Sequence, residues 1–545
     1  MNMLTGDIAL RDIERGTARN LTNNPVPWAS FGVQARVSRD GRRVAYDWFG
    51  SSPGTELRLI DTAGGNPVTV HPPASFIQAL DWTPDGSAVL AVRWLDDGST
   101  QLILVPTTPG QPTVLRSFNW VAPRAALSPD GRFIAYDHPP RDDDRARDVY
   151  IMDLRTKQVR TLLEGAPNEF VAGWSPDGQS LLVGSDRGGT PGAWLLRVTD
   201  GRAVGSPTLV KSDLWRMEPV GILRDGRFYY SVSTGNRGLY MASVDDVSGK
   251  IVGAPTVITQ EGIGNNPAHA WSDDGRLLAH TIENEVTRAR ALVIRSLDGN
   301  AARHFPLPPS IDSLGAQRWL PDRSALIAIG AEKGRRTVFR IDAQTGRIET
   351  ILRAELISGF DVTPDGRSIV YRWVQEEAGG KGASRLVLRD LATGAERVIY
   401  EGRDGGGNRM NAVSVSHDGR SVAFMRNAPA PFANDLTVVP IQGGSARTVF
   451  TTGATASVNF IQAISWGVDD ASLFMSRGGQ IERVPLAGGP AVATGISIKG
   501  LGRMQSDASG RRIVYSGGQN LSELWVLSGF LPSASGRESA RAPRP

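Results

Sequence analysis

Hydrophobic residues along this chain fall in short runs that are separated by turn-forming residues. Examples are Val44-Ala45-Tyr46, Val89–Val92 and Ile134–Tyr136. Runs this short, rich in β-branched and aromatic residues and bounded by Gly, Asp, Ser and Pro, are typical of β-strands. No stretch has the 3.6-residue spacing of apolar positions that an amphipathic helix needs. The pattern therefore predicts an all-β protein.

A short phrase, in its full form Ser or Thr followed by Pro, Asp and Gly, precedes many of these runs. Neighbouring copies lie about 45 residues apart, as Asp85 and Asp130 do. Pro fixes φ, Asp accepts hydrogen bonds from nearby backbone N–H groups, and Gly adopts positive φ, so each copy predicts a tight turn between antiparallel strands. The predicted turn residues are Asp40, Gly41, Asp85, Gly86, Asp130, Gly131, Asp177, Gly178, Asp225, Gly226, Asp274, Gly275, Asp365, Gly366, Asp418 and Gly419.

Each turn is followed by a second predicted hairpin. Val149–Leu154 turns back through Val159–Leu163, for example. A unit of about 45 residues then holds four short antiparallel strands, which is the repeat of a β-propeller blade. Trp often precedes the turn, as Trp82 and Trp174 do, and we expect these rings to pack between neighbouring sheets.

The number of repeats predicts more than one propeller. Three eroded copies of the turn, at 320–323, 467–470 and 508–511, bring the number of predicted four-stranded blades to eleven. Because one propeller usually has four to eight blades, two tandem propellers are expected. A split of six plus five and a split of seven plus four both fit the repeats.

The predicted domains follow from the repeats. We place an N-terminal propeller at residues 1–285, a C-terminal propeller at 286–530 and a disordered tail, rich in Ser, Pro, Arg and Ala, at 531–545. The chain opens with what reads as an outer hairpin over residues 8–22. We expect this hairpin to complete the blade whose inner strands lie at 271–280 and so to fasten the first ring.

The repeat resembles the TolB-like, WD40-like propeller repeat known as PD40, in which Trp-Ser-Pro-Asp-Gly leads into a short apolar strand. Leu127–Tyr136 and Trp174–Gly178 match this pattern most closely, and the resemblance extends over about residues 6–527. It implies a propeller fold. It also implies a choice of roles, since the family includes a periplasmic protein-interaction platform, sensor-like parts of bacterial kinases or DNA-binding proteins, and gating domains of peptidases.

Composition and charge narrow the class of function. The 545 residues include no Cys, which excludes disulfides, thiolate metal sites and a cysteine nucleophile. The net charge of +4 is small and Lys and Arg are spread along the chain, which argues against a nucleic-acid partner. No apolar run is long enough to span a membrane. No secretory signal is visible, so we expect a cytoplasmic protein, or a periplasmic one if an upstream targeting segment is missing.

Candidate chemistry is sparse in this sequence. Gly50–Gly54 satisfies the pattern of a nucleophile elbow, but no helix or hydrolase domain is predicted after it. Residues 142–148 are acidic but lack the glycine and closing glutamate of a calcium loop. The Gly-rich segments 379–382 and 405–407 do not have nucleotide-binding spacing. The six histidines are isolated in the sequence: His71, His138, His269, His280, His304 and His417.

From these residues we predict no catalytic residue, no metal ligand and no cofactor. The predicted function is a non-catalytic binding or scaffold protein that presents channel mouths and loops to a protein, peptide or glycan. Three alternatives stay open: a propeller hydrolase or lyase, the accessory propeller of a peptidase, and the sensor part of a longer kinase or transcriptional regulator.

Overall fold

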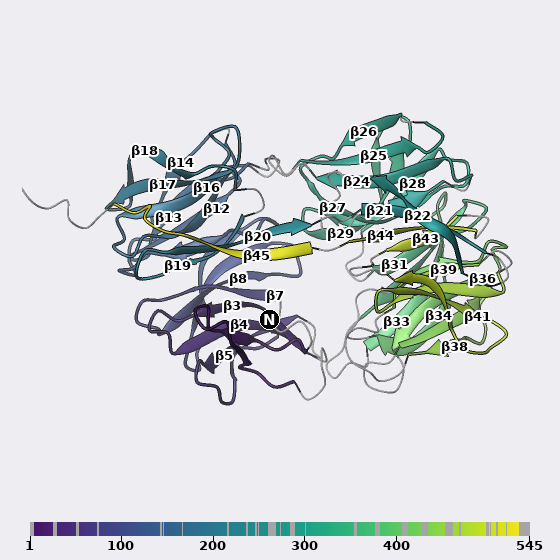
Figure 1. Ribbon diagram of the computed structural model, residues 1–545, viewed down its shortest axis with the longest axis horizontal. Coiled ribbons are helices and arrows are strands. Elements are labelled where there is room, and N and C mark those ends of the chain that lie inside the picture. The colour runs from purple at the N-terminus through teal and green to yellow at the C-terminus, as the bar shows by residue number, and fades with distance from the viewer. Residues whose placement is uncertain are drawn as a thin grey trace, which may run out of the picture. The chain divides into compact units, whose positions relative to one another are not determined.

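Every regular element in the described part of this computed structural model is a β-strand (Figure 1). The structure describes residues 5–24, 30–50, 54–73, 76–141, 144, 146–165, 167–214, 217–235, 238–245, 248, 250–259, 269–272, 274–283, 289–299, 301–353, 357–375, 382–405, 412–427, 434–452, 461–467, 470–497, 501, 503–507, 511–518 and 520–532. The strands pair into small antiparallel sheets, so the prediction of an all-β propeller fold is confirmed. In this described part, no helix is long and apolar enough to cross a membrane.

The sheets of the first half of the chain each contain one copy of the turn phrase, and we number them as blades 1 to 5. A two-stranded hairpin, β1 (Ala9–Arg11) with β2 (Ala18–Asn20), precedes them. Blades 1 and 2 are β3 (Phe31–Val37), β4 (Arg43–Phe49), β5 (Thr55–Asp61) and β6 (Val68–His71), then β7 (Phe76–Trp82), β8 (Ala88–Trp94), β9 (Thr100–Pro106) and β10 (Thr113–Phe118). Blades 3 and 4 are β11 (Ala125–Leu127), β12 (Phe133–His138), β13 (Asp148–Asp153) and β14 (Val159–Leu163), then β15 (Glu169–Trp174), β16 (Ser180–Ser185), β17 (Gly192–Thr199) and β18 (Arg202–Lys211). Blade 5 has three strands, β19 (Met217–Ile222), β20 (Phe228–Gly235) and β45 (Asn520–Leu527).

The remaining sheets are four-stranded and form blades 6 to 11. Blade 6 combines β21 (Gly238–Val244) and β22 (Ile251–Thr259) with β43 (Met504–Ser506) and β44 (Arg512–Gly517). Blades 7 and 8 are β23 (His269–Trp271), β24 (Leu277–Glu283), β25 (Arg290–Ser296) and β26 (Ala302–Pro306), then β27 (Ile311–Trp319), β28 (Ala325–Glu332), β29 (Arg335–Asp342) and β30 (Ile348–Arg353). Blade 9 is β31 (Ile357–Val362), β32 (Ser368–Val374), β33 (Gly382–Asp390) and β34 (Glu396–Gly405). Blades 10 and 11 are β35 (Val413–Val415), β36 (Ser421–Asn427), β37 (Asn434–Pro440) and β38 (Arg447–Thr451), then β39 (Ile461–Trp466), β40 (Ser472–Arg477), β41 (Gln480–Pro485) and β42 (Val492–Ser497).

The turn phrase lies between the first and second strands of its blade, and blade 3 shows its geometry. Asp130 Oδ1 accepts hydrogen bonds from Ser128 Oγ at 2.5 Å and from the N–H of Arg132 at 3.0 Å. Gly131 has φ of 72°, which is unfavourable for residues with a Cβ. The other seven predicted turn glycines also have positive φ: Gly41, Gly86, Gly178, Gly226, Gly275, Gly366 and Gly419.

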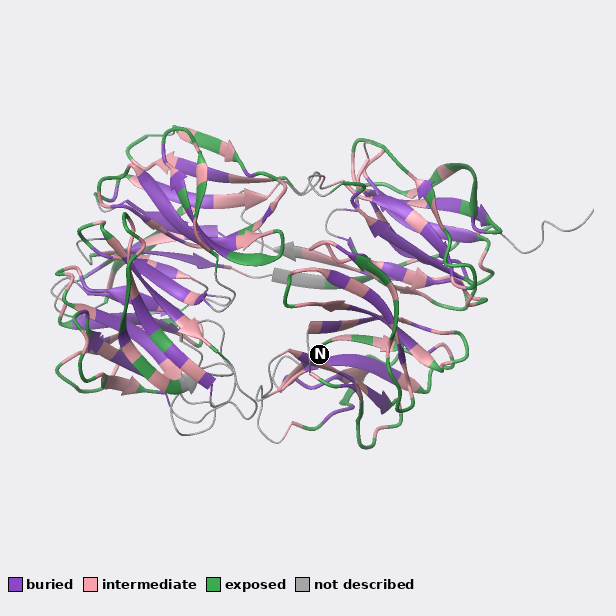
Figure 2. Ribbon diagram, turned by 180° about the vertical axis from the view of Figure 1, so that it is seen from behind, coloured by how far each residue is buried: buried purple, intermediate pink, exposed green. Residues whose placement is uncertain are grey.

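The core lies between blades. In Figure 2 the buried residues follow the middle strands of the sheets; β16 is buried throughout, whereas the outer strand β18 is exposed at most positions. Tryptophans near the ends of the first strands fill the gaps, as we expected. Trp82 is fully buried, and its Nε1 donates to the carbonyl oxygen of Arg36 in the preceding blade at 2.9 Å.

Blades 6 to 11 close into one ring. Blade 6 is built from two distant parts of the chain, since β21 pairs with β44 in antiparallel register with Tyr240 opposite Tyr515. Its apolar residues pack on one side against blade 11 and on the other against blade 7, where Leu239 and Val514 meet Trp271 and Leu278. The last strands of the ring are therefore locked to its first ones.

The predicted boundary at 285/286 and the predicted role of the N-terminal hairpin are both wrong. A boundary at 285/286 would cut blade 7, because β24 pairs with β25 from Leu277 opposite Ser296 to Glu283 opposite Arg290. The inner strands near 271–280 pair with β25 and β26, whereas Ile8 and Leu21, which flank the N-terminal hairpin, pack against blade 1. The six-blade ring is thus the later one along the chain.

The predicted tail begins too early. Leu531 is partly buried against the cluster that contains Phe228 and Tyr230 of blade 5, so the packed chain continues to this residue. Residues 533–545, the rest of the predicted tail, lie outside the described residues. By its contacts the chain divides into two compact units, one of residues 1–122 with 235–520 and the other of 123–234 with 521–545.

Candidate functional site

The innermost strands of blades 6 to 11 share a position that lies four residues before the Asp of the turn, or before the residue that replaces it. We call the six residues at this position the belt: Ala270, Arg318, Asp361, Ser414, Ser465 and Gln505. The first strands of successive blades are neighbours in the ring, so the belt residues lie at the inner edges of adjacent blades.

Charged belt residues join blades 8, 9 and 10. Arg318 Nε donates to Asp361 Oδ1 at 2.6 Å, and the N–H of Val415 donates to Asp361 Oδ2 at 2.9 Å. The side chains of Arg318 and Asp361 are 18% and 12% exposed, so water screens this pair only partly. The Asp361 carboxylate in blade 9 thus bonds to both neighbouring blades, 8 and 10.

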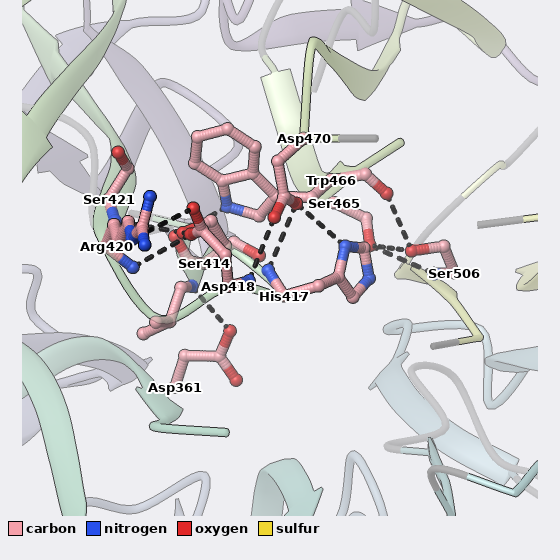
Figure 3. A network of polar contacts seen from close by, with 12 residues as sticks. Asp361, Ser414, His417, Asp418, Arg420, Ser421, Ser465, Trp466, Asp470 and Ser506 are labelled. Carbon is pink, nitrogen blue, oxygen red and sulfur yellow. Dashed lines mark hydrogen bonds and ion pairs between the residues drawn. The ribbon is translucent and has the colours of Figure 1, made fainter. Parts of the chain in front are cut away.

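Neutral groups complete the belt, as Figure 3 shows in part. Ser465 and Ser506 join blades 11 and 6 through their hydroxyl oxygens, 2.6 Å apart. The remaining bonds run from Trp466 Nε1 to the Ser414 carbonyl at 3.0 Å, from Trp319 Nε1 to the Ala270 carbonyl at 3.0 Å, and from Trp271 N to Gln505 Oε1 at 3.4 Å. Every interface of this six-blade ring is therefore bridged by a hydrogen bond at the belt.

A second set of polar contacts joins the turns of blades 10 and 11 (Figure 3). Asp470 occupies the glycine position of an eroded turn and has φ of 53°. Its carboxylate accepts hydrogen bonds from His417 Nδ1 at 2.8 Å, from His417 N at 3.0 Å and from Asp418 N at 2.9 Å. A similar contact joins blades 7 and 8. Arg323 occupies the glycine position of the turn in blade 8 with φ of 62°, and it forms an ion pair with Asp274 in the turn of blade 7.

The His417–Asp470 pair has the spacing of the base and its orienting acid in a nucleophilic triad. A triad also needs a hydroxyl that donates to the second ring nitrogen. Among the described residues, the nearby serine hydroxyls are used otherwise: Ser465 and Ser506 contact each other, and Ser506 Oγ donates to the Trp466 carbonyl at 3.0 Å. In the described residues the pair therefore connects the turns of blades 10 and 11.

Arg503 lies directly before β43, on the inner edge of blade 6. It is partly exposed, and its enclosed Nε has no hydrogen-bond partner among the described residues. Its Nη2 lies 3.8 Å from the point where a Cβ on Gly315 would be, so the guanidinium reaches blade 8. Burial and the positive charges of Arg318 and Arg336 lower the pKa of Arg503 to about 10, and it remains protonated at neutral pH.

Three of the six histidines are less isolated than the sequence suggests. His269 pairs with His280, His280 with Val293, and Val293 with His304, so the three histidines share one face of blade 7. His280 is buried and neither of its ring nitrogens has a hydrogen-bond partner among the described residues. In the same part of the chain no group of three His, Asp or Glu side chains is arranged to hold a metal ion.

Other sequence candidates do not form a site in the described chain. Gly54 of the elbow pattern precedes strand β5 with no helix after it, and residues 51–53 lie outside the described residues. In the acidic loop Asp144 pairs with Arg141 at 3.2 Å, whereas residues 142, 143 and 145 are outside the described part. Most of the Gly-rich segments, at 379–381 and 406–407, also lie outside it.

The belt and Arg503 were missed because the sequence was searched for recurring residues. The belt recurs in position but not in type, since Arg, Asp, Ser, Gln and Ala all occur there. Aligning the repeats on the turn Asp and reading four and six residues upstream would have found both.

Comparisons with known proteins agree with this fold. The PD40 family, described as the TolB beta propeller domain, matches residues 42–209. An uncharacterized protein of Agrobacterium fabrum, Atu1656, is 29% identical over 295 residues, which are 52% of this chain and 92% of that protein.

Three solved structures are similar at lower identity. TolB from Acinetobacter baumannii is 18% identical over 58% of this chain and 65% of its own, with a TM-score of 0.27. A putative TolB from Agrobacterium tumefaciens is 16% identical over 59% of this chain and 96% of its own, with a TM-score of 0.36. The tricorn protease is 12% identical over 90% of this chain and 60% of its own, with a TM-score of 0.28.

Proposed function

We propose that this protein, whose residues 42–209 carry the TolB-type PD40 β-propeller repeat, is a non-catalytic binding or scaffold protein. It presents the mouths of its propeller channels and the loops around them to a protein, peptide or glycan. A rigid set of blades with variable loops suits such a role, because the scaffold fixes the loops without taking part in chemistry.

The observation that carries this proposal is the use of polar side chains in the six-blade ring. Ser465, Asp361 and Asp470, which have the chemistry of catalytic groups, each bond to a neighbouring blade. Of the belt side chains, Arg318, Asp361 and Ser465 each bond to a neighbouring blade and so hold the ring together. A binding role needs no further residue set, whereas catalysis does.

Three other roles are compatible with the same fold. A propeller hydrolase or lyase would need a nucleophile or a metal at one channel mouth. An accessory propeller of a peptidase would act only with a separate catalytic chain, and a sensor would need an attached kinase or DNA-binding part. No specific observation in the described residues favours any of these over binding.

Binding and catalysis can be separated with the purified full-length protein. We expect saturable binding to a subset of an immobilised array of extended peptides and glycans, with affinity unchanged by a metal chelator. The same preparation should not turn over fluorogenic peptide, ester or glycoside substrates. Turnover that follows the protein through purification, or binding to no peptide, glycan or protein bait, would contradict the proposal.

A further inference from the structure

Blade 5 differs from the other ten blades because it has three strands instead of four. Its strand order is β19, β20 and β45, so β45 is the outer strand, and no described strand pairs with its free edge (Figure 1). In the other blades a fourth strand pairs antiparallel with the third, as β14 does with β13 and β18 with β17. The edge of β45 therefore offers backbone N–H and carbonyl groups to a further strand.

β45 also exposes apolar side chains on both of its faces. Leu524, Trp525 and Val526 are 53%, 51% and 50% exposed. Side chains alternate along a strand, so Leu524 and Val526 lie on one face and Trp525 on the other. Third strands that a fourth strand covers are mostly buried, as β13 and β17 are. Trp525 is the only exposed tryptophan among the described residues, and tryptophan is a residue that often dominates binding at protein interfaces.

The outer strands of the blades next to blade 5 along the chain are protected against pairing with a further strand. β18 in blade 4 and β22 in blade 6 contain Pro207 and Pro255, which have no backbone N–H to donate. Gly205 and Gly253, with φ of 71° and 75°, lie where the pairing register of these strands shifts. β45 contains neither proline nor glycine. Its edge is therefore suited to accept a strand.

Charge and area indicate which kind of partner fits β45. Glu523, which accepts a hydrogen bond from Trp525 Nε1 at 3.1 Å, is exposed and is the only charged residue of β45. A positive charge opposite it in a paired strand is favourable. Three half-exposed side chains of at most about 250 Å² each offer less than about 400 Å² together. A stable dimer buries about 800 Å² on each partner, whereas an added strand gains much of its affinity from backbone hydrogen bonds.

We propose that β45 binds an extended segment of a protein partner as the fourth strand of blade 5. The segment runs antiparallel to β45, places apolar residues against Leu524 and Trp525, and has a lysine or arginine opposite Glu523. This inference rests on the proposed binding function and names the chemistry of the partner and the surface that it uses. Backbone hydrogen bonds hold the segment, and the side-chain contacts select it.

The experiment uses the full-length protein and a fluorescein-labelled peptide, Ser-Val-Ile-Thr-Val-Lys-Ser, whose β-branched residues favour an extended backbone. Fluorescence anisotropy should show saturable binding with a dissociation constant below about 100 μM. Two further peptides carry backbone N-methyl groups, one on the even-numbered residues and the other on the odd-numbered residues. Alternate N–H groups of a strand point to opposite edges, so one methylated peptide should bind at least about ten-fold more weakly than the unmodified peptide and the other should bind nearly as well.

Variants connect this binding to β45. Leu524→Lys should weaken binding at least about ten-fold, because it places a charge in the apolar contact. Leu209→Lys is the matched control and should leave binding unchanged, since Leu209 is 49% exposed on the outer strand β18 of blade 4.

A charge exchange tests the role of Glu523. The wild type should bind the lysine peptide about two- to five-fold more tightly than the same peptide with glutamate in place of lysine. Glu523→Lys should reverse this preference. Such a reversal cannot arise from loss of folding, because an unfolded variant would bind both peptides weakly.

Four results would overturn the inference: no binding of the peptide up to about 1 mM, equal binding of the two methylated peptides, equal affinity of Leu524→Lys and Leu209→Lys, and an unchanged charge preference in Glu523→Lys. Self-association in sedimentation velocity that Leu524→Lys abolishes would assign the edge to a second copy of the chain and would overturn it too. The proposed binding function fails separately on the peptide and glycan array. Array ligands that the wild type and Leu524→Lys bind equally would support that function even if β45 accepts no peptide.

Discussion

His280 should make the stability of the six-blade ring depend on pH. Its side chain is 2% exposed and lies on the face of blade 7 that packs against blade 6, the interface at which the ring closes. Burial is the main cause that lowers the pKa of His280 to about 4, and the positive charge of Arg295 adds to it. The native protein therefore keeps this imidazole neutral under conditions in which the unfolded chain protonates it.

The sign and size follow from proton linkage. The unfolded state protonates His280 below a pH of about 6.5, whereas the folded state does so only below about 4. The unfolding free energy therefore has its full value above pH 6.5 and decreases as the pH falls from 6.5 to about 4. A difference from 6.5 to about 4 corresponds to about 3 kcal/mol of unfolding free energy.

Urea unfolding at pH 4 to 8, followed by tryptophan fluorescence, measures the effect. In His280→Leu the decrease of unfolding free energy between pH 7 and pH 4.5 should be smaller than in the wild type by about 2 to 3 kcal/mol. His304→Gln is the control, because His304 is exposed on the outer strand of the same blade and makes the smallest contribution to the lowered pKa of His280. If His280→Leu and the wild type lost stability in parallel as the pH fell, the assignment of a buried, neutral His280 would be refuted.

Three other predictions concern single contacts. Asp470→Gly should lower the unfolding free energy by about 1 to 3 kcal/mol in urea titrations, because the lost hydrogen bonds to blade 10 outweigh the relief of its positive φ. The control Lys157→Gly, also at positive φ, should be neutral or stabilising by about 0.5 kcal/mol. Stabilisation by both changes would contradict the assigned role of the Asp470 hydrogen bonds. Arg318→Gln and Asp361→Asn should show a coupling energy of about 1 to 3 kcal/mol in a double-mutant cycle, and additive effects would mean that the belt pair contributes nothing. Burial raises the pKa of Asp47 to about 6, so the contribution of its protonated form to stability is lost as the pH rises from about 4 through 6. The unfolding free energy of Asp47→Asn should therefore increase by up to about 3 kcal/mol relative to that of the wild type between pH 4 and pH 7.5. A difference in unfolding free energy that stays constant with pH would refute this prediction.

The sequence predicts local structure well in this protein because the turns are local. Asp130 bonds to residues no more than two positions away, and Gly131 needs a positive φ whatever the rest of the chain does. Such turns fix hairpins, and hairpins at a regular period fix blades. The fold class and the number of blades follow from these short-range rules.

Ring closure does not follow from them. β21 and β44 meet across about half of the chain, and β45 returns to pair in blade 5. A blade completed by distant strands has the same local sequence pattern as one completed by its neighbours, so the repeats alone could not place the boundary between propellers. The predicted cut at 285/286 failed because it used the N-terminal hairpin as the closing piece, whereas residues of blades 6 and 7 form that interface.

The eroded repeats show why departures from a repeat are informative. When Gly is replaced by Asp470 or Arg323, the turn keeps its left-handed backbone at a cost of about 1 to 2 kcal/mol. In both cases the new side chain bonds to the turn of the preceding blade, to His417 or to Asp274, and the contact offsets that cost. Arg503 departs from its repeat in the same way, as a long charged residue where the other blades have Ala or Gly, but within the described residues no partner offsets it.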